Sequence, residues 1–552
     1  MKNKVNRALV AKKTINKIVL GTLSLCTFLA SCQEPIPQDQ KDWDNSTAYF
    51  NSSDEAGANT YYKPSVGSVG DPLPFYDPVE KDFKVLYLHN FEKNIEQTFH
   101  PLWGVRTTDA ATYTPMGEVL PFGRAGEQDA ALGTGCVIYD EAQKLYYIYY
   151  TGERYKPASD EDRQVVMRAT SPDFKTWTKD PLFRLRGVEY GYSSANFRDP
   201  YIWKMEDGYH MIVATKPIDS NRIEEKDGCF AEFTSADLVT WEHKGNFSKM
   251  IWDRFLECPN VFKMGDWWYL TYSDMSNFER KVHYLKATTI EGLKAATSPT
   301  WPDYKEGTLD GRAFYAGNTA TDGKDRYMWG WCPVRRNNDN TDISDVVEPQ
   351  WGGTLVAHKI VQREDGTLYL AEIPAIRAKY TKDKEVKVVK KWGEEEGNLA
   401  INNGVYAMKA YSSVMFSTLG YHNHLSMTIT TADKKDRFGL SFVRGDRVEG
   451  DKTYEKYYSL MVCPNGDGSR HFIRLEEEQG VWELKGGASF EFPTPADNTY
   501  KIDVYTDNSV LVLYINDVVT YTQRLYHIQR NCWSVNCYEG EATVKDVQIK
   551  QY

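Results

Sequence analysis

A pattern that returns about every sixty residues constrains the fold of this chain more than any other feature. In each copy an apolar segment meets a polar turn and returns as a segment rich in aromatic residues, which is the pattern of a β-hairpin. The five copies begin at residues 75, 136, 201, 260 and 318, so their first residues lie 61, 65, 59 and 58 positions apart. A step of this length accommodates one four-stranded sheet. We therefore predict five similar sheets in succession.

A second repeated segment has the same period. Residues 170–177 read Thr-Ser-Pro-Asp-Phe-Lys-Thr-Trp, residues 234–241 read Thr-Ser-Ala-Asp-Leu-Val-Thr-Trp, and residues 107–113 are a weaker copy. Repeated four-stranded sheets that close into a ring form a β-propeller. We predict an all-β chain in which residues 67–380 form a five-bladed β-propeller, with Trp177 and Trp241 packing its outer strands. A large β-sandwich and a β-helix are the alternatives, although a β-helix needs a much shorter repeat.

The last third of the chain keeps the strand pattern but loses the sixty-residue step. Residues 351–370 supply two more strands to the repeat, and residues 381–397 are dense in charge, so we interpret them as a linker. Residues 500–521 alternate apolar and polar side chains around two turns, as antiparallel hairpins do. We predict a β-sandwich over residues 398–552.

The first thirty-one residues have the composition of an export signal. Six Lys and Arg residues precede an apolar run, residues 18–30, that is too short to cross a bilayer as a permanent helix. The run ends in Leu-Ala-Ser before Cys32, which resembles a bacterial lipobox; an ordinary signal peptide with an incidental cysteine is the alternative. We expect residues 1–31 to be removed and Cys32 to carry a lipid that anchors the exported protein to the bacterial outer membrane, on the cell surface or the periplasmic face. Residues 32–66 are expected to form a polar tether.

Charge and cysteine usage narrow the class of ligand. The net charge is −11, and removal of the leader, which carries six positive and no negative charges, makes it −17. Such a chain repels nucleic-acid phosphates, so we expect no nucleic-acid partner. Its 37 Tyr and 15 Trp suit a neutral ligand that stacks on aromatic faces. Seven cysteines follow Cys32, and we expect mostly buried thiols rather than a disulfide framework, although Cys532 and Cys537 could pair.

Three short carboxylate motifs stand ahead of three of the hairpins. They are centred on Asp71-Pro72, Asp199-Pro200 and Glu257-Cys258-Pro259. Because the blades of a propeller are related by rotation, equivalent positions converge on one end of its axis, and the three acids are expected to share one site. Each motif alone is ordinary turn chemistry. Together they favour glycoside hydrolysis, which needs one protonated and one ionised acid. No histidine is in phase with the acids, so we expect neither a metal nor a cofactor.

The motifs resemble glycoside hydrolase family 32, the retaining β-fructosidases such as invertases, inulinases and levanases. Residues 197–200, Phe-Arg-Asp-Pro, and residues 257–259, Glu-Cys-Pro, match two of that family's three signature motifs. The resemblance runs from about Gly67 to the end of the chain and implies a five-bladed propeller joined to a β-sandwich. Further matches are Trp103-Gly104, Leu132-Gly-Thr-Gly-Cys136, Phe314-Tyr-Ala316 and Trp351-Gly-Gly-Thr354.

The resemblance also implies catalytic roles. Asp71 would be the nucleophile that forms a fructosyl-enzyme intermediate, and Glu257 the general acid that later activates water as a base. Asp199 would stabilise the oxocarbenium-like transition state. The implied substrate is a fructan of levan or inulin type, or sucrose.

Four further residues are candidates for substrate binding. Arg198 would fix Asp199 and reach the same sugar ring. Thr134 lies in the run that matches the family. Cys258 would tune the pKa of Glu257 unless it is a plain buried thiol, and Trp103 is either a wall of the fructosyl subsite or part of the core.

Two departures from the family pattern fall in the subsite of the reacting sugar. The family's first motif normally reads Trp-Met-Asn-Asp-Pro-Asn-Gly, whereas residues 68–74 read Ser-Val-Gly-Asp-Pro-Leu-Pro. Gly70 therefore replaces an asparagine, and Leu88 stands where a glutamine is expected. An inverting, family 43-like furanosidase or xylosidase and a non-catalytic glycan-binding lipoprotein remain alternatives. Residues 337–342 lack the glycine and final glutamate of a calcium loop, and we interpret them as a polar loop.

Overall fold

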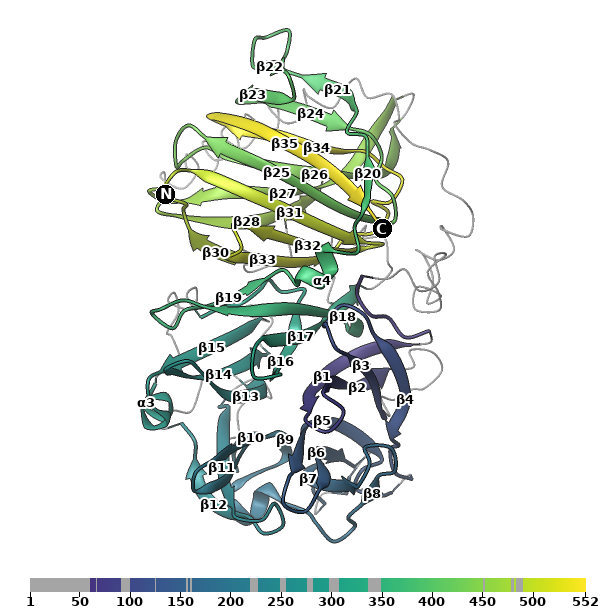
Figure 1. Ribbon diagram of the computed structural model, residues 1–552, viewed down its shortest axis with the longest axis vertical. Coiled ribbons are helices and arrows are strands. Elements are labelled where there is room, and N and C mark those ends of the chain that lie inside the picture. Colours follow the sequence, from purple (N-terminus) through teal and green to yellow (C-terminus); the bar gives the residue numbers. More distant parts are fainter. Residues whose placement is uncertain are drawn as a thin grey trace, which may run out of the picture.

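The computed structural model describes residues 60–65, 67–90, 100–124, 126–154, 157–158, 161–218, 227–248, 255–275, 281–296, 307–335, 349–449, 452–477, 481–482 and 490–552. The expected leader, Cys32, most of the expected tether and the polar loop at residues 337–342 lie outside these ranges. The described chain forms two units stacked along its long axis, with the N-terminal unit at the bottom of Figure 1 and the C-terminal unit at the top.

Five groups of antiparallel strands make up the N-terminal unit, each built from strands that are consecutive in the sequence. The five predicted hairpins are confirmed as the first two strands of these groups, which we number as blades I to V. Blade I contains β1 (Ser68–Asp77), β2 (Asp82–Asn90), β3 (Leu102–Thr107) and β4 (Thr114–Leu120); blade II contains β5 (Ala131–Asp140), β6 (Leu145–Glu153), β7 (Gln164–Ser171) and β8 (Thr178–Lys179); blade III contains β9 (Tyr192–Met205), β10 (Gly208–Pro217), β11 (Cys229–Ser235) and β12 (Glu242–Asn246); blade IV contains β13 (Leu256–Met264), β14 (Trp267–Asp274) and β15 (Val282–Ala287), followed by α3 (Ile290–Ala295); and blade V contains β16 (Tyr315–Thr321), β17 (Arg326–Arg335), β18 (Pro349–Gln362) and β19 (Leu368–Ala371).

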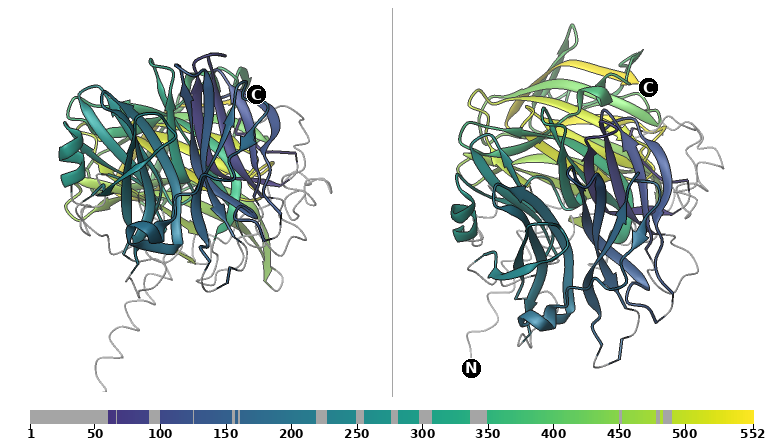
Figure 2. Two further views of the ribbon diagram at one scale, coloured as in Figure 1. Left: turned by 90° about the horizontal axis from the view of Figure 1, so that it is seen from below. Right: turned by 60° about the horizontal axis from the view of Figure 1, so that its bottom comes forward.

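The first strands of the blades form a closed ring. Strand β1 contacts β5, β5 contacts β9, β9 contacts β13, β13 contacts β16, and β16 returns to β1. Blades I and V are also joined by a backbone pairing of β1 with β18, in which Val69 faces Gly353. Figure 1 shows the blades in this order around the lower unit, and Figure 2 shows blades III and IV on the side opposite blades I and II. The predicted five-bladed propeller is therefore confirmed.

The second repeated segment forms the turn between the third and fourth strands of blades I, II and III. In each turn one Asp Oδ1 accepts the backbone N–H groups of the residues two and three positions later, and it also accepts the hydroxyl of a Ser or Thr two positions earlier. The next residue has a left-handed backbone conformation, with φ between 54° and 61°. We call these the outer turns; their acids are Asp109, Asp173 and Asp237.

Two sheets packed face to face form the C-terminal unit and confirm the predicted β-sandwich, whose inner side chains make one apolar cluster. One sheet has the order β22 (Leu399–Asn402), β23 (Val405–Lys409), β35 (Glu541–Gln551), β25 (His422–Thr431), β31 (Thr499–Asp507), β32 (Val510–Ile515) and β33 (Val519–Arg524), with β20 (Lys382–Lys384) paired to β35. The other has the order β21 (Val388–Trp392), β24 (Ser412–Phe416), β34 (Trp533–Glu539), β26 (Arg437–Glu449), β27 (Lys452–Asn465), β28 (Arg470–Glu477) and β29 (Val481–Trp482), with β30 (Phe490–Pro493) paired to β28.

The segment expected to be a linker differs from that expectation. Residues 381–397 contain β20 and β21, which pair with one strand of each sandwich sheet. Val386 and Val388 from this segment pack against the sandwich core, so its dense charge concealed a strand pattern. The end of the expected tether is also ordered, because the Thr60 and Tyr61 N–H groups both donate to Asp507 Oδ2 at 2.8 Å.

The two units share a buried interface. One apolar cluster contains Met328 and Trp329 of the propeller together with Val512 and Tyr514 of the sandwich. Buried hydrogen bonds cross the same boundary, including one from Thr522 Oγ1 to Asp310 Oδ2 at 2.6 Å. The short helix α4 (Pro374–Arg377) lies where the chain passes from one unit to the other (Figure 1).

Cysteine placement agrees with the sequence interpretation. All seven cysteines in the described ranges are buried free thiols, and Cys532 and Cys537 do not form a disulfide with each other. Among the helices in those ranges, none has the length and apolar character needed to cross a membrane.

Candidate active site

The first strand of every blade carries a β-bulge at a matching place. There the register slips by one residue, so the inner strand has one residue more than its partner. Strand β9 has a second irregularity closer to its start, between Tyr192 and Phe197. Bulges re-aim side chains and are common beside active sites. They lie between Val69 and Pro72, Gly133 and Gly135, Arg198 and Tyr201, Glu257 and Asn260, and Tyr315 and Asn318.

The three candidate acids occupy successive positions around these bulges. Glu257 precedes the bulge of β13, Asp199 is the first bulged residue of β9, and Asp71 is the second bulged residue of β1. The sequence had placed the acids before their strands and at equivalent positions. The structure corrects both points, because the strands begin earlier than the hairpin pattern indicated and each acid is displaced by one residue from the next.

The bulged backbone is strained where the acids gather. Asp199, Cys258 and Ala316 each stand first in their bulge and have φ of 58°, 49° and 54°. A non-glycine residue in this left-handed region costs on the order of 1–3 kcal/mol, and the surrounding structure must hold it there. Such strain is common at active sites, so these three bulges make this end of the ring a candidate site.

Asp71 is oriented by donors from two other blades. Thr134 Oγ1 of blade II donates to Asp71 Oδ2 at 2.8 Å, and Trp331 Nε1 of blade V donates to Asp71 Oδ1 at 2.8 Å. These two bonds, one to each carboxylate oxygen, fix the orientation of the side chain. The side chain is therefore suited to act as an oriented nucleophile.

Glu257 lies in a chain of side chains that crosses three blades. Arg198 of blade III donates to Glu257 Oε1 from Nη2 at 2.9 Å and from Nε at 3.3 Å. The Tyr315 hydroxyl of blade V donates to Glu257 Oε2 at 2.5 Å. All three residues stand directly before their bulges, so this chain is a consequence of the repeat. The Glu257 side chain remains 19% exposed, which leaves it within reach of a substrate and of water.

Asp199 is buried among charges of both signs. Burial raises its pKa to about 7, with the negative charges of Glu257 and Asp71 acting in the same direction and Arg198 opposing them. The Cys258 N–H donates to Asp199 Oδ2 at 2.9 Å, and the Asp199 N–H donates to Thr151 Oγ1 at 3.0 Å. Asp199 is thus held rigidly and changes charge near neutral pH.

Arg198 is anchored from several sides. Its Nη1 donates to Gln164 Oε1 at 3.2 Å and to Asn196 Oδ1 at 3.0 Å, and its guanidinium lies 4.1 Å from the ring centre of Phe255. Burial opposes its charge, but Glu257 and Asp199 outweigh burial and raise the pKa of Arg198. It therefore supplies a fixed positive charge between the two acids.

Cys258 and Thr134 both lie in the site. The Cys258 thiol is buried, and burial raises its pKa well above the ordinary value, with the three nearby acids adding to the effect. The thiol is therefore protonated, and it is the backbone N–H of Cys258 that contacts Asp199. Thr134 is buried and contacts the nucleophile candidate directly.

A close contact with a neighbouring ring explains why residue 70 is a glycine in this chain. A Cβ atom on Gly70 would collide with the indole ring of Trp351. Trp351 in turn stacks on His100, with ring centres 4.1 Å apart. Burial lowers the pKa of His100 to about 4, so the imidazole is neutral and serves as a packing surface. Trp351 thus occupies the space that a side chain at position 70 would need.

Trp103 and Leu88 pack into the fold beside the site. Trp103 on β3 stacks on His89 with ring centres 4.2 Å apart, and burial lowers the pKa of His89 to about 4. Leu88 is buried in an apolar cluster with Leu102 and Leu132. Both side chains therefore have packing partners in the fold.

The sequence interpretation gave no functional role to three residues of the site. Trp331, Tyr315 and Trp351 lie in segments that the repeat or the family resemblance had marked, but their side chains received no role. The signal was their position, because Tyr315 and Trp331 are a cross-strand pair at the bulge of blade V. Only the closed ring shows that they face Asp71 and Glu257.

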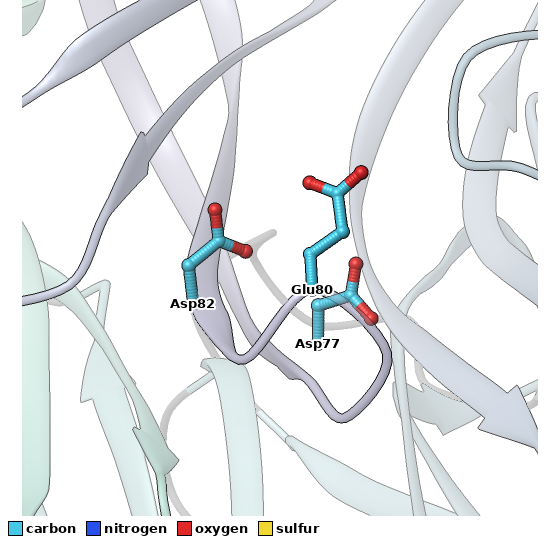
Figure 3. A group of neighbouring side chains, drawn as sticks. All are labelled: Asp77, Glu80 and Asp82. Carbon is cyan, nitrogen blue, oxygen red and sulfur yellow. The ribbon is translucent and has the colours of Figure 1, made fainter.

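A second acidic group lies on the β1–β2 turn, at the other end of the inner hairpin. Asp77, Glu80 and Asp82 converge there (Figure 3). The Lys84 ammonium lies 3.5 Å from Asp77 Oδ2, 2.5 Å from Glu80 Oε2 and 2.6 Å from Asp82 Oδ1, so it already supplies the positive charge that a metal ion would bring. We interpret this group as an ion-pair network.

Comparison with known protein families covers nearly the whole described chain. Residues 62–373 match the model of the glycosyl hydrolases family 32 N-terminal domain, and residues 366–549 match that of the GH32, BT1760-like, C-terminal domain. The fold and the carboxylate cluster define a protein of the glycoside hydrolase class. The chain belongs to glycoside hydrolase family 32.

Individual relatives agree with this family. A sucrose-6-phosphate hydrolase of Vibrio alginolyticus is 26% identical over 372 residues, which make up 62% of this chain and 62% of that protein, less than two thirds of its length. The solved structure of a sucrose-6-phosphate hydrolase from Lactobacillus gasseri has a TM-score of 0.65 and 14% identity, covering 94% of this chain and 97% of the other. Fructan 1-exohydrolase IIa from Cichorium intybus, in complex with 1-kestose, has a TM-score of 0.66 and 14% identity, covering 90% and 97%. At these identities the structural likeness shows a shared fold.

Proposed function

We propose that the protein is a β-fructosidase that hydrolyses β-fructofuranosidic bonds in fructans of levan or inulin type, or in sucrose. The observation that carries the proposal is the set of three acids held in different ways at one end of the ring. Asp71 is bound by two neutral donors, Glu257 lies between Arg198 and Tyr315, and Asp199 is buried. Membership of family 32 supports it, as do relatives named for the hydrolysis of a sucrose phosphate and of fructan.

In the proposed reaction two displacements occur at the anomeric carbon of the fructosyl unit. Asp71 attacks this carbon, and the glycosidic oxygen leaves with a proton from Glu257, which yields a fructosyl ester and a free leaving sugar. Water then attacks the same carbon while Glu257 takes its proton, and Asp71 departs as a carboxylate. The product keeps the anomeric configuration of the substrate.

Asp199 and Arg198 have positioning roles in this scheme. The ionised Asp199 accepts hydrogen bonds from sugar hydroxyls and stabilises the positive charge that develops on the ring. Arg198 shifts donors from Glu257 to the sugar as it binds, which frees Glu257 to hold the proton that the first step needs. Gly70 and Trp351 replace a polar contact of the family by an aromatic wall in this subsite.

A substrate panel tests the proposal. The protein is incubated with levan, inulin, sucrose, sucrose 6-phosphate and arabinan, product sizes are read by chromatography, and the anomer formed first is followed by NMR. We expect fructose or fructo-oligosaccharides with retained configuration from at least one fructoside. An inverted first product would instead support a family 43-like mechanism with Asp71 as a general base. Binding of levan or inulin without release of sugar, unchanged by Asp71→Asn, would indicate a glycan-binding protein.

We also propose that the protein is exported and lipid-anchored through Cys32, since its leader resembles that of a bacterial lipoprotein. The Cys32→Ser variant is expected to lose incorporation of radiolabelled palmitate and to leave the membrane fraction. Continued labelling of this variant would contradict the assignment of the anchor.

A further inference from the structure

A buried arginine of the sandwich reaches into the propeller. Arg524 ends β33 and is fully buried. Its Nε donates to the carbonyl oxygen of Pro333 at 2.7 Å, and its Nη2 donates to the carbonyl oxygen of Cys332 at 2.8 Å and to Thr354 Oγ1 at 2.9 Å. A further bond from Nη1 to Ser509 Oγ, at 3.0 Å, fixes the guanidinium to its own unit. One side chain thus joins the sandwich to both β17 and β18.

These contacts fall beside the residues that surround the nucleophile candidate. Cys332 directly follows Trp331, whose indole N–H donates to Asp71. Thr354 stands three residues after Trp351, whose ring covers Gly70. Pro333 pairs with Gly353, and Gly353 also pairs with Val69 of β1, two residues before Asp71. The guanidinium therefore fixes the place where β17, β18 and β1 meet.

The chemistry of the contact is specific to a planar cation. An apolar side chain of similar size would fill the interface without the cost of removing a charge from water. Guanidinium donors point in fixed directions within one plane, so they set the spacing of the carbonyl groups they bind. Burial lowers the pKa of Arg524 to about 10, which still leaves the group charged at neutral pH. An arginine at this position therefore gives the interface a defined hydrogen-bond geometry, at the cost of removing its charge from water.

We propose that Arg524 is a positioning residue for the proposed reaction: by holding β17 and β18 it fixes Trp331 and Trp351 around Asp71, and so makes the sandwich part of the catalytic apparatus. The inference rests on the role of Asp71 given above. It assigns to the C-terminal unit a contribution to turnover in addition to stability.

A matched pair of interface variants distinguishes an effect of Arg524 on the active site from an effect on stability alone. Arg524→Met removes the three bonds to β17 and β18, whereas Thr520→Val removes one from the same strand to the carbonyl oxygen of Leu370 on β19. We expect Arg524→Met to lower kcat on the preferred fructoside about tenfold or more with less than a twofold change in KM, since small misplacement of reacting groups is costly. Thr520→Val is expected to lower the melting temperature but to keep kcat. Unchanged kcat in folded Arg524→Met would overturn the proposal.

A double variant tests whether the effect passes through Trp331. If Arg524 acts by placing this indole, Trp331→Phe and the double variant Arg524→Met/Trp331→Phe should lose the same activity within about twofold. Additive losses would mean that Arg524 acts elsewhere. Arg524→Lys, which keeps the charge but not the planar fork, should recover part of kcat and serves if Arg524→Met does not fold.

A spectroscopic measurement keeps this inference separate from the proposed activity. In protein with 15N-labelled tryptophan, the indole N–H resonance of Trp331 is assigned by its loss in Trp331→Phe. We expect this resonance to shift in Arg524→Met and to stay in place in Thr520→Val. An unmoved resonance would reject the positioning role even in an active enzyme. Wild-type protein that hydrolyses no fructoside would reject the proposed activity, while the resonance would still report whether Arg524 places Trp331.

Discussion

The inner and outer ends of the propeller blades differ in what their copies share. At the outer turns of blades I, II and III the same side chains recur, and each Asp makes the same hydrogen bonds. At the inner ends all five blades share a bulged backbone, but the side chains on it differ from blade to blade. Repetition of side chains therefore marks structure, whereas repetition of backbone with varied side chains marks the site.

The largest expected effect comes from an inner acid exchanged for its amide. Asp71→Asn is expected to lower turnover at least about a hundredfold, because the amide is a poor nucleophile, while the amide oxygen can still accept from Trp331 and the amide nitrogen can donate to Thr134 Oγ1. Asp173→Asn makes the identical change at an outer turn and is expected to keep full turnover. The pair is compared by initial rates and thermal melts. Equal rates in the two variants would end the distinction between the two ends.

Glu257→Gln sharpens the comparison by separating proton donation from charge. We expect a loss of at least about a hundredfold on a natural fructoside, whose leaving sugar needs a proton. In kcat/KM, which reports the steps up to formation of the fructosyl-enzyme, the loss should be much smaller with an aryl fructoside, whose leaving group departs without protonation. The ratio of the two rates is the measurement, and a similar loss on both substrates would contradict a role as the general acid.

Asp199→Asn is expected to stabilise the folded protein at pH 8, although substitutions of buried, hydrogen-bonded residues usually destabilise a protein. The folded-state pKa of about 7 lies above the ordinary value of about 4, so the folded protein binds more protons than the unfolded chain between these pH values. Stability contributed by this group is present at low pH and is lost as pH rises from about 4 to about 7. At pH 8 we therefore expect the variant to gain ~1–3 kcal/mol relative to wild type, less than the ~4 kcal/mol of three pKa units because Arg198 loses an opposite charge.

Urea unfolding of wild type and Asp199→Asn at pH 5 and pH 8 measures this difference. Turnover is expected to fall at both pH values. A variant that is equally destabilised at both pH values would show that Asp199 is ionised throughout this range.

The smallest effects are expected at the outer turns. Asp173→Ala and Asp237→Ala each remove two backbone hydrogen bonds and one from a hydroxyl, and we expect each to lower the free energy of unfolding slightly. Because the two turns lie in different blades, the double variant should lose the sum. Turnover at 25 °C should not change, and a fall in kcat would show that the outer turns also shape the site.

Local patterns predicted most of the architecture. The sixty-residue step predicted five blades, and alternation around Asn516-Asp517 predicted hairpins that the structure contains. The β-strands in residues 381–397 were hidden because several Lys and Glu residues of this segment are exposed, among them Lys382, Glu385 and Lys391, while Val386 and Val388 pack against the sandwich core. A charge count over a window does not distinguish a linker from an edge strand of this kind.

The convergence of the three acids at one end of the ring was predicted, but most of the side chains that contact them were not. Asp71, Asp199 and Glu257 lie in short sequence motifs that can be recognised without a structure. Trp331 and Tyr315 act from blade V on acids about 260 and 58 residues earlier in the chain, and that contact exists only after the ring has closed. The bulges were equally hidden, since a one-residue slip between two strands depends on both strands.

The pairing of Val69 with Gly353 also determines when the site forms. The chain must be synthesised through blade V before β1 finds its last neighbour, and a contact between residues so far apart in sequence forms slowly because closing a long loop is entropically costly. Asp71 lies two residues from this closure, and Trp331 arrives on the closing blade. During refolding, strand content should therefore return first, and the oriented carboxylate should be among the last features of the molecule to form.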